Sequence, residues 1–393
     1  MKILMINTVC GFGSTGRICT DLAEILDRQG HQVKIAYGRG VVPKQHQKYA
    51  VRIGYELDVR LHALSARLFD CAGFGSKKVT KAFIRWIQEY DPDIIHLHNL
   101  HGYYLNIEVL FRYLATCRKR VFWTLHDCWA YTGHCAYYSA IGCDKWKSAC
   151  KKCLQKKQYP QSVLLNRARN NFQRKRQVFT ALDRMTLITP SKWLADQTRE
   201  SFLNKYPVKV IPNGIDLNQF QPTKNTIRSQ HDLENKKIIL GVASVWDERK
   251  GLKDFIKLRE LLDPSYKIVL IGVTKAQSNK LPKDIVCIER TNNIVELAQW
   301  YTVADVFVNP SVEETMGLTT VESLACGTPV ITYNRTAVPE VVDQSCGLVV
   351  DCKPEFIVEA LDRIQCDSLA CRLHAKNYEK EQQYMKYVQL YAE

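Results

Sequence analysis

Short runs of apolar, β-branched residues alternate with longer amphipathic stretches along the whole chain. In the first half the apolar runs are 3–9, 33–37, 94–97, 121–125 and 185–189, and helical periodicity marks 16–29, 78–90 and 105–117. Regular alternation of these two patterns is typical of βαβ units, whose parallel sheet is covered by helices on both faces. The first half therefore predicts a Rossmann-like, doubly wound α/β domain.

The second half repeats this alternation. Its strand-like runs are 238–245, 267–271, 285–288, 305–309, 330–332 and 348–350, and its clearest helical patterns are 252–262 and 294–304. The turn-rich segment 212–216 separates the halves, and a last helical pattern covers 369–391. We expect domains at 1–212 and 213–372, with 373–393 forming a helix that packs back toward the first domain. Doubly wound sheets bind ligands beyond the carboxyl ends of their strands, so two facing domains predict a site in a central cleft.

The segment 309–330 contains the most informative pattern for function. A strand ends near Pro310, a loop carries Glu314, and a helix from about Leu318 to Cys326 carries Glu322. The start of such a helix offers unpaired N–H groups to phosphates, and a carboxylate one turn further can accept two hydrogen bonds from a ribose diol. The break at Gly317 allows both carboxylates to face one extended ligand.

This segment, with Pro-Ser-x-x-Glu before it and Ala-Cys-Gly-Thr-Pro-Val after it, resembles the donor motif of the family 4 retaining glycosyltransferases of GT-B fold. The resemblance implies that Glu322 holds the nucleotide ribose and that Glu314 lies at the donor sugar. It also implies that the backbone amides of Gly317, Leu318 and Thr319 take the diphosphate. The fold implied is GT-B, which consists of two Rossmann-like domains.

Two further loops fit this resemblance. Arg249 and Lys250 precede a helix start, as in the Lys-Gly turn whose Lys binds the donor diphosphate in this family, although Ser244 replaces an Arg that many members carry. The loop that contains Gly13 and Gly16 follows the first strand and permits close backbone approach to the donor. Its glycine spacing also occurs in dinucleotide-binding proteins, but the acidic residue expected about 20 positions later is absent.

Histidines follow two of the predicted strands in the first half. His126 ends the run 121–125 and resembles the family histidine that contacts the hydroxyls of the donor sugar, so we assign it a catalytic role with Glu314. His98 follows the run 94–97 and is a candidate for the acceptor side, whereas we interpret His96 as structural. Asp91-Pro92-Asp93 has the spelling of a metal–diphosphate motif, but it precedes its strand and reads as a turn. No metal is then expected in catalysis.

A cysteine-rich insertion at about 128–160 allows two interpretations. Cys150 and Cys153 have the two-residue gap of a zinc knuckle, and Cys135 and Cys143 complete a set of four thiolates for a structural zinc. The alternative is a set of reduced thiols. The odd total of 15 cysteines and the absence of a secretion signal favour a reducing compartment, so we expect a cytoplasmic protein.

The charge of the chain is concentrated in its first half, where residues 1–212 carry a net charge of +19 against −4 for 213–393. The longest acid-free basic stretch, 145–176, follows the cysteine-rich insertion. Such a surface attracts anionic partners, and an anionic membrane leaflet fits a lipid-linked acceptor. Nucleic acid fits less well because the basic stretch is not interleaved with base-stacking aromatic residues.

The function implied by the resemblance is transfer of a hexosyl or related sugar, an EC 2.4 activity, from a UDP- or GDP-sugar to a glycan or polyprenyl-diphosphate-linked acceptor. The Gly-Ser-Thr-Gly-Arg-Ile loop is similar to those of colanic-acid-like enzymes of bacterial capsule, O-antigen and exopolysaccharide synthesis. Two other interpretations stay open, a sugar-nucleotide epimerase of the same fold and a basic nucleic-acid-binding protein. The expected location is the cytoplasm, at the inner face of the membrane if the leaflet is engaged.

Overall fold

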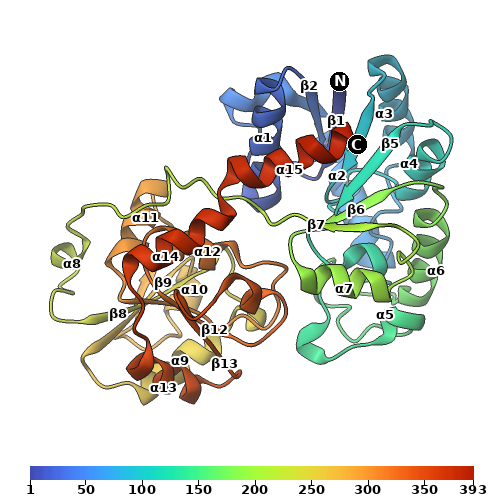
Figure 1. Ribbon diagram of the computed structural model, residues 1–393. Helices are drawn as coiled ribbons and strands as arrows, with labels where there is room; N and C mark the ends of the chain where they lie inside the picture. Colours follow the sequence, from blue (N-terminus) through green and yellow to red (C-terminus); the bar gives the residue numbers. More distant parts are fainter. The chain divides into compact units, whose positions relative to one another are not determined.

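The computed structural model describes all 393 residues, and its internal contacts divide the chain into two compact units (Figure 1). The first unit contains Met1–Pro212 together with Tyr384–Glu393, and the second contains Asn213–Gln383. Each unit is built on a parallel sheet, as the alternation of apolar and amphipathic segments predicts. No helix has the length and apolar character needed to cross a membrane.

The first unit contains a seven-stranded parallel sheet in the order β3-β2-β1-β4-β5-β6-β7. The strands are β1 (Lys2–Asn7), β2 (Gln32–Tyr37), β3 (Ala50–Arg52), β4 (Ile94–Leu97), β5 (Arg120–Thr124), β6 (Thr186–Thr189) and β7 (Val208–Val210). The helices of at least eight residues are α1 (Gly13–Arg28), α2 (Glu56–Phe69), α3 (Lys77–Tyr90), α4 (Ile107–Leu114), α6 (Ala168–Phe179) and α7 (Lys192–Glu200). The strand order reverses direction between β1 and β4, which creates a switch point there.

Two apolar clusters cover the two faces of this sheet. The larger one joins β4 and β5 to α4, α6 and the cysteine-rich insertion, and it contains Trp123 and Trp129. The other joins α1 to the last turns of α15 (Lys380–Ala392), the C-terminal helix. Tyr391 of α15 is fully buried against Phe122, and Arg120 donates hydrogen bonds to the carbonyls of Leu390 and Tyr391. The end of the chain is therefore part of the first unit's core.

The second unit contains a six-stranded parallel sheet in the order β10-β9-β8-β11-β12-β13. The strands are β8 (Lys237–Val242), β9 (Tyr266–Ile271), β10 (Val286–Ile288), β11 (Val306–Asn309), β12 (Val330–Tyr333) and β13 (Gly347–Val350). The longer helices within the unit are α9 (Leu252–Leu261), α11 (Ile294–Val303), α12 (Leu318–Ala325), α13 (Pro354–Arg363) and α14 (Ser368–Ala375). Its switch point lies between β8 and β11, so the loops that follow these two strands are neighbours.

The prediction of one helix over 369–391 is wrong. The helical pattern is interrupted by a 3₁₀ turn at Lys376–Tyr378, and α14 and α15 are separate helices. The interruption has a tertiary cause, because Ile215 bridges this segment by accepting from the Lys380 N–H and donating to the Tyr378 carbonyl. A side chain at Gly214 would collide with Lys380, so the two backbones are in close contact. A long-range contact of this kind leaves no periodic signal in the sequence.

Replacing Tyr391 with Ala should destabilise the first unit by about 3–5 kcal/mol, because a fully buried aromatic ring is removed and a cavity is left behind. The measurement is urea-induced unfolding followed by intrinsic fluorescence. Leu369→Ala, at an exposed position of α14, is the control and should change stability by less than about 0.5 kcal/mol. An unchanged unfolding midpoint for Tyr391→Ala would show that the last turns of α15 are not part of the core.

Candidate functional site

The loop that follows β8 presents a lysine beside the switch point of the second unit. Asp247 accepts hydrogen bonds from the backbone N–H groups of Arg249 and Lys250, which closes a tight turn. Gly251 then adopts a φ of +74° and begins α9. A Cβ atom at Gly251 would lie 2.6 Å from Cγ of Pro310, so only glycine lets this turn pack against the end of β11.

The loop that follows β11 meets this turn directly. The Val312 N–H donates to the Arg249 carbonyl at 2.8 Å, and Lys250 Nζ forms an ion pair with Glu314 Oε1. The Glu314 N–H in turn donates to Thr336 Oγ1 at 3.0 Å. The structure thus brings together Lys250 and Glu314, which are 64 positions apart in the sequence.

The start of α12 completes this group of residues. Gly317 has a φ of +87° at the N-terminal end of the helix, and its side-chain position is free of contacts shorter than 3.5 Å. Asn309, the last residue of β11, donates to Thr320 Oγ1 at 2.9 Å and fixes the first turn. Leu318 and Thr319 are the first helical residues, whose N–H groups have no partner within an α-helix.

The two remaining polar candidates of the second unit have defined partners. Tyr301 donates from its hydroxyl to Glu322 Oε2 at 2.9 Å, and this holds the carboxylate that lies one turn into α12. The Arg249 guanidinium donates two hydrogen bonds to Asp247 Oδ2, at 2.8 and 3.1 Å. Arg249 is therefore paired with Asp247, a carboxylate of its own turn, whereas Lys250 is the cation that pairs with Glu314.

In the first unit, the glycine loop lies at the carboxyl end of β1. Gly11 has a φ of +77° and donates to the Gly16 carbonyl at 3.1 Å, which closes the loop over the start of α1. A Cβ atom at Gly16 would be 3.0 Å from Val9, so this position requires a small residue. At Gly13, with a φ of +64°, a Cβ atom would contact nothing within 4 Å, so the backbone there faces open space.

The predicted site histidines of the first unit lie next to each other at the ends of β4 and β5. His98 Nδ1 is 3.0 Å from His126 Nε2, and the two rings are stacked. Both side chains are buried, and burial lowers the pKa of His126 to about 4 and that of His98 well below its usual range. Both imidazoles are therefore uncharged at neutral pH, a state in which each ring has one donor and one acceptor nitrogen.

His96 lies on the core side of this pair. Its Nε2 atom is 2.8 Å from Thr124 Oγ1, and its Nδ1 atom is 2.6 Å from the hydroxyl of Tyr391 on α15. Both ring nitrogens are used within the unit, and the side chain is fully buried.

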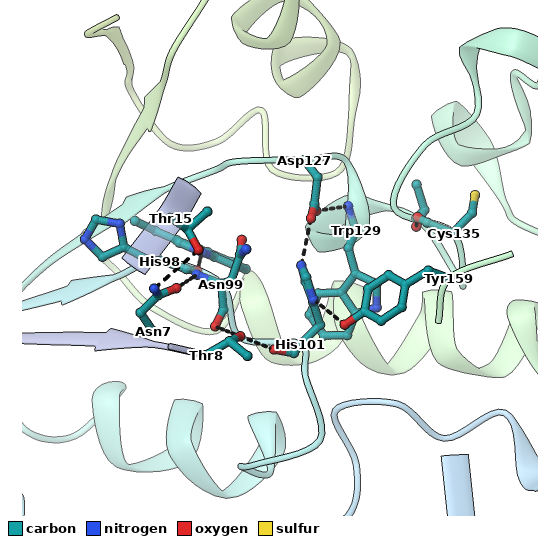
Figure 2. A network of polar contacts seen from close by, with 12 residues as sticks. Asn7, Thr8, Thr15, His98, Asn99, His101, Asp127, Trp129, Cys135 and Tyr159 are labelled. Atoms are coloured by element: carbon teal, nitrogen blue, oxygen red, sulfur yellow. Dashed lines mark hydrogen bonds and ion pairs between the residues drawn. The ribbon is translucent and has the colours of Figure 1, made fainter. Parts of the chain in front are cut away.

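A second polar group at the same strand ends is absent from the sequence-based predictions. His101 lies between Asp127 and Tyr159, with Nε2 2.7 Å from Asp127 Oδ2 and Nδ1 2.8 Å from the tyrosine hydroxyl (Figure 2). Burial raises the pKa of Asp127, but His101 and the Trp129 N–H lower it more, and the net shift is downward. His98, His101, His126 and Asp127 line one small pocket. Two features of the sequence could have indicated this group. A second histidine, His101, follows β4, and an acid, Asp127, directly follows His126.

Asp91 and Asp93 lie at the opposite edge of this sheet. Asp93 accepts from the Lys2 N–H at the start of β1, and Asp91 ends α3 and pairs with Lys119. The Asp-x-Asp spelling is thus a turn at the amino ends of the strands, away from His98 and His126.

The structural zinc predicted at Cys135, Cys143, Cys150 and Cys153 is not supported. The only three His, Cys or acidic side chains whose ligand atoms all lie within 4.8 Å of one another are Asp343, Cys346 and His374, in the second unit. Three of the four predicted thiols have partners within the protein, since Cys150 Sγ accepts from the Gly133 N–H and Cys135 contacts Cys153. A neighbouring buried lysine, Lys175, donates to the carbonyls of Trp129 and Thr132 and holds the insertion from inside.

Comparisons with known proteins match both halves of the chain. A family model described as "Glycosyltransferase Family 4" matches residues 15–219, and one described as "Glycosyl transferases group 1" matches 223–383. The curated relative "Putative colanic acid biosynthesis glycosyl transferase WcaC" of Escherichia coli is 31% identical over 229 residues, which are 55% of this chain and 55% of that protein. The chain thus spans about half the length of this relative.

Two solved structures share the fold over the whole chain. Sucrose-phosphate synthase from Thermosynechococcus elongatus has a TM-score of 0.72 at 19% identity, covering 100% of this chain and 98% of that one. HepE from Anabaena, in complex with UDP, has a TM-score of 0.69 at 14% identity and 100% coverage of both chains. At these identities the similarity establishes the fold.

The pKa of His126 leads to a test of the first unit's site. Its C2 proton resonance should titrate near pH 4 and not near 6.5, because burial disfavours the imidazolium. The folded state then loses stability as the pH falls from 6.5 toward 4, by up to about 3 kcal/mol from this group, because the unfolded chain binds the proton first. The measurement is NMR titration with His126→Gln to assign the signal. Titration above pH 6 would contradict a buried, neutral histidine.

Proposed function

Because the chain belongs to glycosyltransferase family 4, we propose that it transfers a sugar from a nucleoside-diphosphate sugar to a glycan or lipid-linked glycan. The observation that carries this proposal is the group of residues at the switch point of the second unit. There a lysine, a carboxylate and the start of a helix converge from two loops, Lys250 from one and Glu314 and α12 from the other. A cation beside unpaired helix N–H groups is suited to a diphosphate.

The second unit supplies the donor site in this proposal. The diphosphate accepts from the backbone N–H groups of Gly317, Leu318 and Thr319 and is neutralised by Lys250, so that no metal ion is required. The ribose diol donates to the carboxylate of Glu322, which Tyr301 orients. Arg249 supports the turn through Asp247 and adds positive charge to the same loop.

The first unit supplies the sugar-facing and acceptor-side groups. Gly13 and Gly16 admit the donor close to the backbone at the end of β1, because side chains there would be strained or crowded. His126 bonds to donor-sugar hydroxyls as a neutral imidazole, and His98 serves the acceptor side. We assign the acceptor role to 1–212, the donor role to 213–372, and a joining role to the helical segment 373–393.

Family membership implies a reaction with retention of anomeric configuration. In the mechanism that we propose, the acceptor hydroxyl attacks the anomeric carbon from the face that the diphosphate leaves. The departing phosphate oxygen takes the hydroxyl proton as the new glycosidic bond forms. Glu314 and His126 stabilise the positive charge that develops on the sugar ring, and Lys250 stabilises the negative charge on the diphosphate.

The donor base and the biological process are proposals drawn from relatives. The HepE structures hold UDP and UDP-glucose, which favours a UDP-sugar here, and a GDP-sugar is the alternative. The name of WcaC refers to colanic acid biosynthesis, which favours a role in bacterial capsule, O-antigen or exopolysaccharide synthesis. A sugar-nucleotide epimerase would convert the donor without an acceptor, so product analysis separates the two enzyme classes.

Replacing Glu322 with Ala should weaken UDP binding about 10- to 100-fold, because the ribose diol loses a charged acceptor of two hydrogen bonds. Isothermal titration calorimetry with UDP measures this change. Glu248→Ala is the matched control, since Glu248 is an exposed carboxylate of the second unit that pairs with the equally exposed Lys253. Equal UDP affinity for Glu322→Ala and the native chain would remove the ribose assignment.

Replacing Lys250 with Met should lower the turnover number about 100- to 1,000-fold, because charge on the leaving diphosphate grows in the transition state. The assay is release of UDP from a UDP-sugar, with and without a glycan acceptor. Lys253→Met removes an exposed lysine three positions later and should leave turnover unchanged. If both variants turn over at the native rate, the diphosphate is bound elsewhere.

A further inference from the structure

Helix α2 of the first unit carries a row of leucines on its outer surface. Leu57, Leu61 and Leu64 follow each other at helical spacing and are 66%, 58% and 56% exposed. The inner face of the same helix is formed by Val59, His62 and Ala66, which are buried. The helix therefore has one apolar face that packs within the unit and a second one, the leucine row, that the unit does not cover.

A second apolar segment lies beside the end of this helix. The Val163 N–H donates to the Arg67 carbonyl at 2.7 Å, and the Leu165 N–H donates to the Leu68 carbonyl at 3.2 Å. The side chains of Val163, Leu164 and Leu165 are all exposed. These backbone bonds place the segment beside the end of α2. We call the six exposed apolar residues of the helix and the segment the leucine face: Leu57, Leu61, Leu64, Val163, Leu164 and Leu165.

Basic side chains border the leucine face. The 153–157 segment is tied to it, because Lys156 Nζ donates to the Val163 carbonyl and Asn166 bonds to the backbone of Cys153 in both directions. The exposed cations on and beside this segment are Lys151, Lys152, Lys157, Arg167 and Arg169. The stretch 145–176 contains no acidic residue, so these charges are not offset by neighbours in sequence.

Three basic residues of this stretch do not contribute to the border. Lys175 is buried beneath the insertion, where burial lowers its pKa to about 7. Arg174 pairs with Glu108 and lies over the ring of Phe74, and Lys147 pairs with Glu200. Lys156 bonds to the Val163 carbonyl and the exposed Lys157 follows it, so cations do lie beside the exposed segment 163–165.

We propose that the leucine face docks on an anionic lipid surface, with the leucines entering the headgroup region and the lysines facing lipid phosphates. Exposed apolar patches of this kind mark interaction sites on the surfaces of water-soluble proteins. Apolar residues on one helix face bordered by cations are typical of interfacial membrane helices. A protein partner with an apolar groove would not need the acid-free lysine border, and a second copy of the chain would place like charges together.

The docking proposal rests on the proposed function only for its biological role, which is to bring the first unit to an acceptor carried by a membrane lipid. The electrostatic part strengthens binding about fivefold for each basic residue near an anionic leaflet. Salt screens this part but not the apolar part. Binding should therefore weaken strongly, but not vanish, when the ionic strength is raised.

The test is co-sedimentation of the full chain with vesicles of phosphatidylcholine alone and of phosphatidylcholine with 30% phosphatidylglycerol. Only the anionic vesicles should bind at low salt. Leu61→Gln with Leu64→Gln should lower the partition coefficient about tenfold or more and abolish the salt-resistant fraction. Leu369→Gln with Leu373→Gln is the matched control, because these leucines are similarly exposed on α14 of the second unit.

Charge reversal at Lys151, Lys152 and Lys157 should lower low-salt binding by at least about a hundredfold. All variants should keep native circular dichroism and native UDP release from a UDP-sugar. Equal binding to both vesicle types, no binding, or native binding by the α2 variant would overturn the docking proposal while leaving the transferase proposal intact. A concentration-dependent dimer that the α2 variant abolishes would also overturn it, since a second copy would then cover the face. If the native chain released no UDP from a UDP-sugar, that result would instead refute the proposed function.

Discussion

The ion pair between Lys250 and Glu314 exists because two loops meet at the switch point of one sheet. In a parallel sheet all carboxyl ends lie at one edge, and the reversal of strand order makes the loops after β8 and β11 neighbours. Gly251 permits the last step of this approach, since any side chain there would collide with Pro310. In the ligand-free protein Lys250 and Glu314 neutralise each other. An arriving diphosphate competes with Glu314 for Lys250, and this frees the carboxylate to face the sugar under the proposed function.

Much of the fold was predictable from local pattern, because each buried strand is a short β-branched run that ends in a turn. The observed β4 coincides with the predicted run 94–97, and the helix that follows Gly317 begins where the pattern placed it, at Leu318. Errors occurred where a distant residue decides the local structure. The break before α15 depends on Ile215, which is more than 160 positions away. Short strands such as β3, with half-buried residues, gave too weak a signal.

The candidate site shows the same division. Glu314, Glu322 and Lys250 could be predicted as site residues because a contiguous motif surrounds each of them, and their roles stay predictions. His101 was missed because its partners, Asp127 and Tyr159, are 26 and 58 positions away. The zinc prediction failed for a related reason, because the spacing of Cys150 and Cys153 is compatible with a metal but does not determine where the thiols point. In the structure the insertion is stabilised by aromatic packing and by the hydrogen bonds of Lys175. The prediction had assigned this stabilising role to a metal ion.

Charge is distributed differently in the two candidate sites. Burial keeps His98 and His126 uncharged at neutral pH, so these two side chains of the first unit offer hydrogen-bonding groups without charge. The second unit offers a cation and a helix start, which select for anions. A nucleotide sugar has both chemistries in one molecule, a dianionic diphosphate and a neutral polyol. Under the proposed function these neutral imidazoles bind the polyol of the donor, and the burial that keeps them neutral costs stability below about pH 6.5.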